Sequence, residues 1–176
     1  MQGGYSEADV KIYERAGVSK QTLAAQQQKM QTECASAQPA MKDRGKWLEM
    51  AAASGDEHAQ LVYSGDPGAV LGDATEMIRD PDKVKKYKEV ARGYLLNLAS
   101  KGNTDALMAL AGHYTSGVVF PKDPVRAYAY YRAIELAKPG SISKQLMDYQ
   151  AKDVPYGRLS EAEALGKRIY GNCCAN

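Results

Sequence analysis

Residues 94–137 read YLLNLASKGNTDALMALAGHYTSGVVFPKDPVRAYAYYRAIELA, and this stretch decides the fold. Leucine, alanine and tyrosine recur in it at spacings of three and four residues, which places them on one face of a helix. Gly102 and Gly117 each follow the last periodic residue of a segment, where a left-handed C-cap favours glycine. The stretch therefore predicts a helix, a turn, a second helix, a turn and a third helix.

Asp-Pro pairs mark expected helix starts in three places. Aspartate is a favoured N-cap because its side chain accepts a hydrogen bond from a first-turn N–H, and proline suits the first helical position. The pairs are Asp66-Pro67, Asp80-Pro81 and Asp123-Pro124. No segment has a convincing strand pattern, so we expect an all-α fold. The other expected helices lie at about 6–16, 19–37 (stopped by Pro39), 41–54, 83–100, 141–152 and 160–173, and 56–64 and 68–79 are expected to be shorter helices or turns.

One phrase of the sequence recurs, which indicates a repeated helical hairpin. When Gly55 is aligned with Gly102, KWLEMAAASGDEHAQL falls on GYLLNLASKGNTDALM, and Trp47 becomes equivalent to Tyr94. A third copy, YRAIELAKPG, ends at Gly140 with one extra residue. The three glycines stand 47 and then 38 residues apart. Such periods are typical of stacked helical repeats.

The stretch ALMALAGHYTSGVVFPKDPVRAYAYYRAIELA resembles the Sel-like repeat family, which is related to the tetratricopeptide repeats. The matching residues are Ala106, Leu110, Tyr114, Gly117, Val119, Asp123, Ala127, Tyr131 and Ala133. The match is most specific over about 94–140 and partial over 45–64. The resemblance implies an α-solenoid of antiparallel helical hairpins with a concave groove used for protein contacts, often in bacterial envelope or signalling proteins. It implies no catalytic chemistry.

The length of 176 residues is that of one domain. We expect 1–176 to form a single all-helical repeat domain. In this interpretation 1–40 holds N-terminal helices, 41–140 is the repeat region and 141–176 holds C-terminal capping helices. A terminal cap is expected because the last repeat of a stack must cover an apolar face.

Charge and hydropathy argue against two classes of partner. The formal net charge is only +2, so no strong field attracts nucleic acid or anionic lipid. No apolar run approaches the roughly 18 residues that a membrane span needs. We expect no nucleic-acid partner and no membrane span. One local basic cluster is either a solvated helix face or a surface for an acidic partner: Lys83, Lys85, Lys86, Lys88 and Arg92.

The three cysteines indicate a disulfide. We expect Cys34 to pair with Cys173 or Cys174, because a terminal segment frays without an anchor. In the chain-entropy model, closing so long a loop contributes roughly 4–5 kcal/mol. A disulfide favours a periplasmic or secreted protein whose signal peptide has been removed. The alternative is three reduced thiols in the cytoplasm. The spacing does not suit a zinc site, so we expect no metal and no cofactor.

Aromatic residues are the candidate binding groups. Tyrosine outnumbers phenylalanine 12 to 1, and a tyrosine ring can pack while its hydroxyl stays hydrated. Tyr128 and Tyr131 share one side of their helix, whereas Tyr130 points elsewhere, so one side is core and the other lines a groove. Tyrosine is a common anchor of protein interfaces. The predicted partner-binding residues are Tyr114, Phe120, Tyr128, Tyr130 and Tyr131.

No catalytic set stands out. His58 and His113 have no companion that the sequence identifies, so we expect structural histidines. Ser141 and Lys144 match the Ser-x-x-Lys pattern, but a bare match is common and Ser141 is interpreted as a helix N-cap. We therefore expect a non-catalytic protein–protein interaction module of the bacterial envelope. Its partner would be a secreted toxin that it neutralises as an immunity protein, or a secretion component that it serves as an assembly adaptor. The alternative is an envelope hydrolase acting on cell wall or a β-lactam.

Overall fold

The computed structural model describes residues 7–41 and 43–175, apart from the side chains of residues 7–9, 31 and 34–41. Every regular element in this part of the chain is a helix, which confirms the all-α expectation. The helices are α1 (Glu7–Arg15), α2 (Lys20–Met41), α3 (Arg44–Ala53), α4 (Glu57–Gly65), α5 (Pro67–Leu71), α6 (Ala74–Arg79), α7 (Pro81–Ser100), α8 (Thr104–Ser116), α9 (Pro124–Ala137), α10 (Lys144–Asp153) and α11 (Leu159–Cys173). Among the described residues, no helix is both long and apolar enough to span a membrane.

The chain divides into two compact units, Met1–Arg44 and Gly45–Asn176. The sequence predicts one domain in which N-terminal helices occupy 1–40, and the division lies close to the expected end of those helices. The first unit contains α1 and α2. The second contains nearly all of α3 and every later helix, so it includes the whole stretch in which the repeat was found.

In the first unit, α1 packs against α2 around Leu23, which is buried. The Val18 N–H closes the turn by donating to the Tyr13 carbonyl at 3.0 Å. Ser19 caps α2, as expected, by accepting from a first-turn N–H at 3.1 Å. The expected end of this helix before Pro39 is wrong, because α2 continues to Met41. A proline removes one N–H from the helical ladder, and here the helix ends only two residues later.

The second unit contains two pairs of consecutive helices, α3–α4 and α7–α8, whose connecting turns lie at matching positions; we call each helix–turn–helix pair a hairpin. Helix α3 ends at Ala53 and α7 ends at Ser100, while α4 begins at Glu57 and α8 begins at Thr104. Both boundaries are therefore 47 residues apart, the offset that the sequence alignment gives. The fold repeats the same turn at the positions where the sequence repeats itself.

Both turns use the same backbone chemistry. Gly55 and Gly102 have φ angles of 97° and 80°, in the left-handed region that favours glycine. Asp56 and Asn103 then cap the following helices, each accepting from the backbone N–H three residues on, at 2.6 and 3.0 Å. These caps satisfy donors that have no partner inside the helix.

All three Asp-Pro pairs start helices, as predicted. The side chains of Asp66, Asp80 and Asp123 accept from the N–H three residues on, at 3.0, 2.9 and 3.1 Å. The prolines are the first residues of α5, α7 and α9. A missing N–H is harmless there because first-turn donors have no intrahelical acceptor.

The two hairpins are joined through Ser64, a fully buried residue of α4. Its hydroxyl donates to the Gln60 carbonyl at 2.8 Å and lies 3.3 Å from the carbonyl of Ala91 in α7. Its own carbonyl accepts from the Tyr87 hydroxyl of α7 at 3.1 Å and from the His113 ring of α8. One small polar residue thus connects α4 to both helices of the next hairpin.

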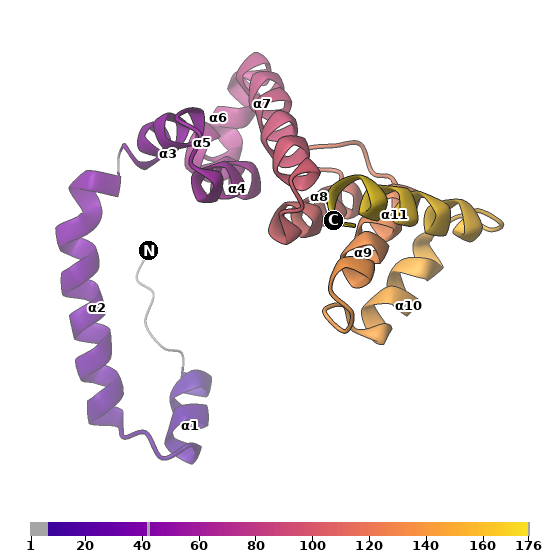
Figure 1. The fold of residues 1–176 in the computed structure, drawn as a ribbon. Coiled ribbons are helices and arrows are strands. Elements are labelled where there is room, and N and C mark those ends of the chain that lie inside the picture. The colour runs from indigo at the N-terminus through magenta and orange to yellow at the C-terminus, as the bar shows by residue number, and fades with distance from the viewer. Residues whose placement is uncertain (1–6, 42, 176) are drawn as a thin grey trace. The chain divides into compact units, whose positions relative to one another are not determined.

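Helix α9 is the central helix of the C-terminal half and contacts α8, α10 and α11 (Figure 1). Gly166 lets α11 approach closely, since a Cβ at that position would lie 2.9 Å from the Ala129 carbonyl oxygen. The Glu163 carboxylate accepts from Arg132 Nε at 2.9 Å and from the Tyr128 hydroxyl at 2.5 Å. Close backbone approach and a half-buried polar cluster together hold α11 on α9.

The start of α10 differs from the prediction. Ser143, rather than Ser141, is the N-cap, and it accepts from a first-turn N–H at 3.2 Å. The carboxylate of Glu135 accepts from the Gly140 and Ile142 N–H groups at 2.8 and 3.0 Å, which lowers its pKa. This closure of the α9–α10 loop keeps the preceding residues out of the helix.

Candidate functional site

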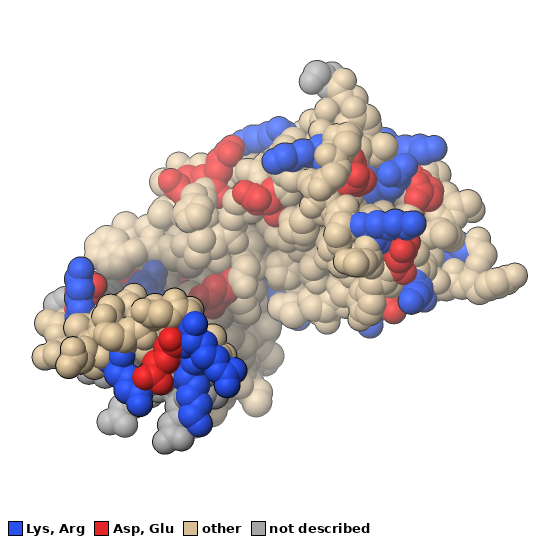
Figure 2. All heavy atoms as spheres, turned by 90° about the horizontal axis from the view of Figure 1, so that it is seen from below, with Lys and Arg blue, Asp and Glu red and all other residues tan. Residues whose placement is uncertain are grey.

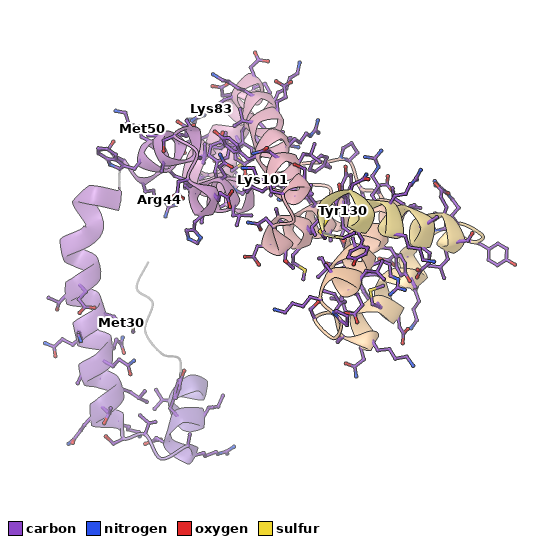
Figure 3. The ribbon with its side chains drawn as sticks, viewed as in Figure 1. Met30, Arg44, Met50, Lys83, Lys101 and Tyr130 are labelled. Atoms are coloured by element: carbon purple, nitrogen blue, oxygen red, sulfur yellow. A yellow bond between two sulfur atoms is a disulfide. The ribbon has the colours of Figure 1, made fainter. Side chains whose placement is uncertain are left out.

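Three of the five predicted binding residues meet in an aromatic stack beside the α8–α9 loop. The ring centroids of Tyr114 and Phe120 lie 4.6 Å apart, and those of Tyr114 and Tyr130 lie 5.7 Å apart with an interplanar angle of 11°. Tyr114 and Phe120 are buried, and Tyr130 (labelled in Figure 3) is half-buried. Such pairs contribute about 0.5–1.5 kcal/mol beyond the area they bury. The main role of the stack is therefore to stabilise the packing of these residues.

Two arginines hold this stack from different helices. The Arg126 guanidinium lies 5.5 Å from the Tyr114 ring centroid and donates to its hydroxyl at 3.1 Å. Arg92 of α7 lies 5.2 Å from the Phe120 centroid and donates to the Val119 carbonyl at 2.9 Å. Cation–π contacts contribute about 0.5–1 kcal/mol at exposed sites. Arg92 is thereby fixed on the surface of α7.

Tyr128 and Tyr131 do not join the stack, although they lie on the same helix as Tyr130. Tyr128 is buried between α9 and α11, and burial, together with its bond to Glu163, raises its pKa to about 12. Tyr131 is buried in the main core, and burial raises its pKa as well. The enclosed members of the predicted set therefore serve in packing, and Tyr130 has the most surface to offer a partner.

Helix α7 carries the basic cluster, which we call the basic ridge: Lys83, Lys85, Lys86, Lys88 and Arg92. Its four lysines form no ion pair with any described residue. Lys85, Lys88 and Arg92 stand three and four residues apart on one side of α7, and Lys83 and Lys86 stand three apart on another side. Like charges at such spacings destabilise a helix by about 0.2–0.5 kcal/mol per pair. On the face that Figure 2 shows, by contrast, Lys and Arg lie close to Asp and Glu. The ridge is thus a local excess of uncompensated charge.

Two shallow depressions border the ridge. One, of about 280 Å³, is lined by Pro81, Val84, Lys85, Lys88, Glu89 and Arg92. The other, of about 150 Å³, is lined by residues of α3, α4, α5 and α7, among them Glu49, Tyr63, Val70, Lys83 and Lys86. Burial and the nearby Glu49 and Tyr94 raise the pKa of Tyr63 to about 12, so its hydroxyl stays protonated at neutral pH. Each depression combines apolar surface with more cations than carboxylates.

Sequence reasoning missed an exposed apolar pair on α3. Trp47 and Met50 stand three residues apart and are 61% and 58% exposed (Met50 is labelled in Figure 3). The equivalent of Trp47 in the next hairpin, Tyr94, is half-buried and lies edge-on to Tyr63 at 5.5 Å. The alignment of Trp47 with Tyr94 equated the two positions, but it did not show that of these two residues only Tyr94 lies against another described ring.

The cysteines do not pair as predicted. Cys173 and Cys174 are bonded to each other instead of to Cys34, whose side chain lies outside the described residues. Each cysteine can form one disulfide, so the bond between the two adjacent residues leaves neither of them available to Cys34. The pair packs on the main core, and the Cys173 carbonyl oxygen would lie 3.0 Å from a Cβ at Gly102. The disulfide therefore marks where α11 meets the α7–α8 turn.

The remaining candidates for catalysis or metal binding lie in surroundings that indicate structural roles. The pKa of His113 is lowered by burial, an effect that its bond to the Ser64 carbonyl partly offsets. Ser141 and Lys144 are exposed, and no hydrogen bond joins their side chains in the described structure. Within residues 7–41 and 43–175, no group of three or more His, Cys, Asp or Glu side chains is placed to hold a metal ion.

No protein-family model, no curated protein and no solved structure matches this chain.

Proposed function

We propose that the chain is a non-catalytic protein–protein interaction module of the bacterial envelope. Its partner is a secreted toxin or a secretion component, so that the chain serves as an immunity protein or an assembly adaptor. The binding surface is the groove of a short α-solenoid built from Sel-like hairpins, together with the exposed apolar pair of its first helix, α3. The matching boundaries of α3–α4 and α7–α8 support this repeat architecture.

The observation that carries the proposal is the exposed pair Trp47 and Met50 on α3. Trp47 is the one tryptophan of the chain, and more than half of its surface is in contact with water. Tryptophan is strongly enriched among the residues that contribute most to protein–protein binding. Met50 adds a flexible apolar side chain of the kind that adapts to partner surfaces. Covering both side chains would gain roughly 25 cal/mol per Å² of apolar area removed from water.

The oxidised cysteine pair supports the proposed location. Disulfides persist mainly in the periplasm and other oxidising spaces, and they are rare in the cytoplasm. The Cys173–Cys174 bond is of this kind. The resemblance to a repeat family that is frequent in bacterial envelopes points to the same compartment.

The test is affinity capture from lysate of the source organism with oxidised protein as bait, followed by purification of the captured partner. We expect one stoichiometric partner that binds wild-type protein in calorimetry and binds Trp47→Ala at least roughly tenfold more weakly, the effect expected of an interface anchor. Tyr156→Ala is the matched control, because Tyr156 is also aromatic and fully exposed but lies in the α10–α11 loop.

Two results would contradict the proposal. One is the absence of any protein that binds the purified chain directly. The other is a captured partner whose affinity is the same for wild-type protein and for Trp47→Ala. If the partner is a toxin, its activity in the presence of the chain separates the immunity role from the adaptor role.

A further inference from the structure

We propose that the side of the basic ridge formed by Lys85, Lys88 and Arg92 binds an acidic, extended segment of a protein partner, with carboxylates on these cations and small apolar side chains in the depression beside them. This inference deepens the proposed function and rests on it, because a ridge of this kind selects a partner only if the chain binds one. It assigns a surface and a chemistry that the exposed pair on α3 does not supply.

Charge is the first argument. On this side of the ridge, Lys85, Lys88 and Arg92 line a depression that contains one carboxylate, Glu89. Glu89 forms no ion pair with a ridge lysine in the described structure. Lys83, Lys85 and Lys86 are exposed, and Lys88 is half-buried. An anionic segment would replace repulsion between these side chains with attraction, and it would be steered to them from a distance.

The second argument is the shape beside the charges. Pro81 and Val84 lie with Lys85 and Lys88 in the depression on this side of α7. An extended chain presents alternate side chains to opposite sides. A segment that alternates acidic and small apolar residues can therefore place both kinds where the ridge accepts them.

Preorganisation is the third argument. Arg92 ends the ridge and is fixed by its bond to the Val119 carbonyl and its contact with Phe120. A cation that is already held loses little freedom when it binds a carboxylate. The ridge thus has one rigid anchor at its C-terminal end and mobile lysines at its N-terminal end.

The observations favour a protein over other anions. From Lys83 to Arg92 the ridge spans nine residue steps of α7, or about 14 Å. That is short for nucleic acid, whose binding proteins commonly neutralise several phosphates, and no aromatic side chain on the ridge is free to stack on a base. Four of the five cations are lysines rather than the bidentate arginines that suit phosphate.

The experiment uses full-length oxidised protein and a fluorescein-labelled peptide of repeated Glu-Glu-Leu triplets, with a Gln-Gln-Leu peptide as the uncharged control. Binding is followed by fluorescence anisotropy. We expect saturable binding of the acidic peptide alone, weakening as salt is raised. The variant Lys85→Glu/Lys88→Glu should weaken it roughly tenfold or more. The matched control is Lys152→Glu/Lys167→Glu, which changes the net charge equally at exposed lysines of α10 and α11, and it should bind like wild type.

Circular dichroism establishes that each variant is folded, and Lys85→Gln/Lys88→Gln gives an intermediate loss without reversing charge. Equal peptide affinity for the ridge variant and the control variant would overturn the inference. So would tighter binding of single-stranded oligonucleotide or phosphatidylserine vesicles than of the peptide, because either would assign the ridge to another class of partner.

The two proposals can fail separately. If a captured partner loses affinity for Trp47→Ala but not for Lys85→Glu/Lys88→Glu, the proposed function stands and the inference of an acidic segment is rejected. If no partner is captured but the acidic peptide binds in a way that depends on Lys85 and Lys88, the inference about the ridge stands and the proposed envelope function is rejected.

Discussion

The hairpins α3–α4 and α7–α8 have the same type of turn, the same type of cap and the same boundaries on either side of the turn, yet their first helices have different surroundings. Trp47 of α3 is largely exposed, whereas its equivalent Tyr94 packs edge-on against Tyr63. Leu48 is half-buried, whereas its equivalent Leu95 is fully buried. Local sequence makes the two hairpins alike, and their position in the order of helices makes them different.

The physical reason is the number of neighbours. Helix α7 packs against α4, α5, α6, α8 and α11, so its apolar face is covered from several sides. Among the described residues of the second unit, no other helix packs on α3 to a comparable extent, and Trp47 and Met50 on it are exposed. Those neighbours decide how much of a side chain is buried, and burial decides most of its contribution to stability.

The largest effect is expected from truncating two equivalent leucines. Leu95→Ala should lower the free energy of unfolding by about 2–5 kcal/mol, because it leaves a cavity in a fully packed core. Leu48→Ala should lower it by about 1–2 kcal/mol, since part of that side chain already contacts water. Urea unfolding at neutral pH measures both. Equal losses would mean that the two hairpins are equally covered.

The second test uses the glycines of the two turns. Gly55→Ala and Gly102→Ala both place a Cβ at positive φ, at roughly 1–2 kcal/mol each. At Gly102 the new Cβ would also lie 3.0 Å from the Cys173 carbonyl oxygen, whereas nothing lies within 4 Å at Gly55. We expect Gly102→Ala to be the more destabilising in thermal unfolding. The reverse order would show that α11 does not pack on the α7–α8 turn.

The caps offer a test in which the two hairpins should behave alike. Asp56→Ala and Asn103→Ala each remove one bond to a first-turn N–H, and each should lower stability by about 1 kcal/mol. Asp123→Ala, which removes the cap of α9, should have a similar effect. If urea unfolding shows a loss of stability for the variant at only one of the two turns, the two hairpins are not equivalent.

A smaller effect should appear in the pH dependence of stability. The pKa of His113 is lowered in the folded protein by burial, so the unfolded chain binds the proton more readily. Its contribution is fully present above the unfolded pKa of about 6.5 and is lost as pH falls below that value. In urea unfolding between neutral and mildly acidic pH, His113→Gln should flatten this loss, and the exposed His58→Gln should not. An unchanged slope in His113→Gln would assign the pH dependence to other groups.

The smallest effect concerns the cysteines. Unreduced, denatured protein should contain one free thiol, at Cys34, and peptide mapping should find the disulfide between Cys173 and Cys174. Reduction should shift the urea midpoint only slightly, because a link between adjacent residues restrains little of the unfolded chain. A bond to Cys34, or three free thiols, would contradict the pairing in the structure.

Much of the fold could be predicted because its signals are local. Asp66, Asp80 and Asp123 start helices through bonds to N–H groups three residues away, and the turn glycines act through their own φ angles. The misplaced start of α10 shows the limit. Ser141 and Ser143 are equally good caps in sequence, and the choice between them depends on Glu135 closing the loop from the preceding helix.

The candidate site could be predicted only in part. The pattern singled out the five aromatic residues and the basic ridge, but helical spacing does not tell which side of α9 another helix will cover. Tyr128 became part of the contact with α11 through Glu163, and Tyr130 joined the stack with Tyr114. Trp47 was missed because an apolar residue in a helical stripe is expected to be buried.

The sequence by itself determined the all-α class, the caps, the turns and the 47-residue offset between the hairpins, since each depends on residues a few positions apart. Only the tertiary structure decided which members of each stripe are covered, how Ser64 connects three helices, and where the lysines of α7 form no ion pair with another described residue. Those outcomes depend on contacts between segments that are distant in the chain, and no local pattern contains them.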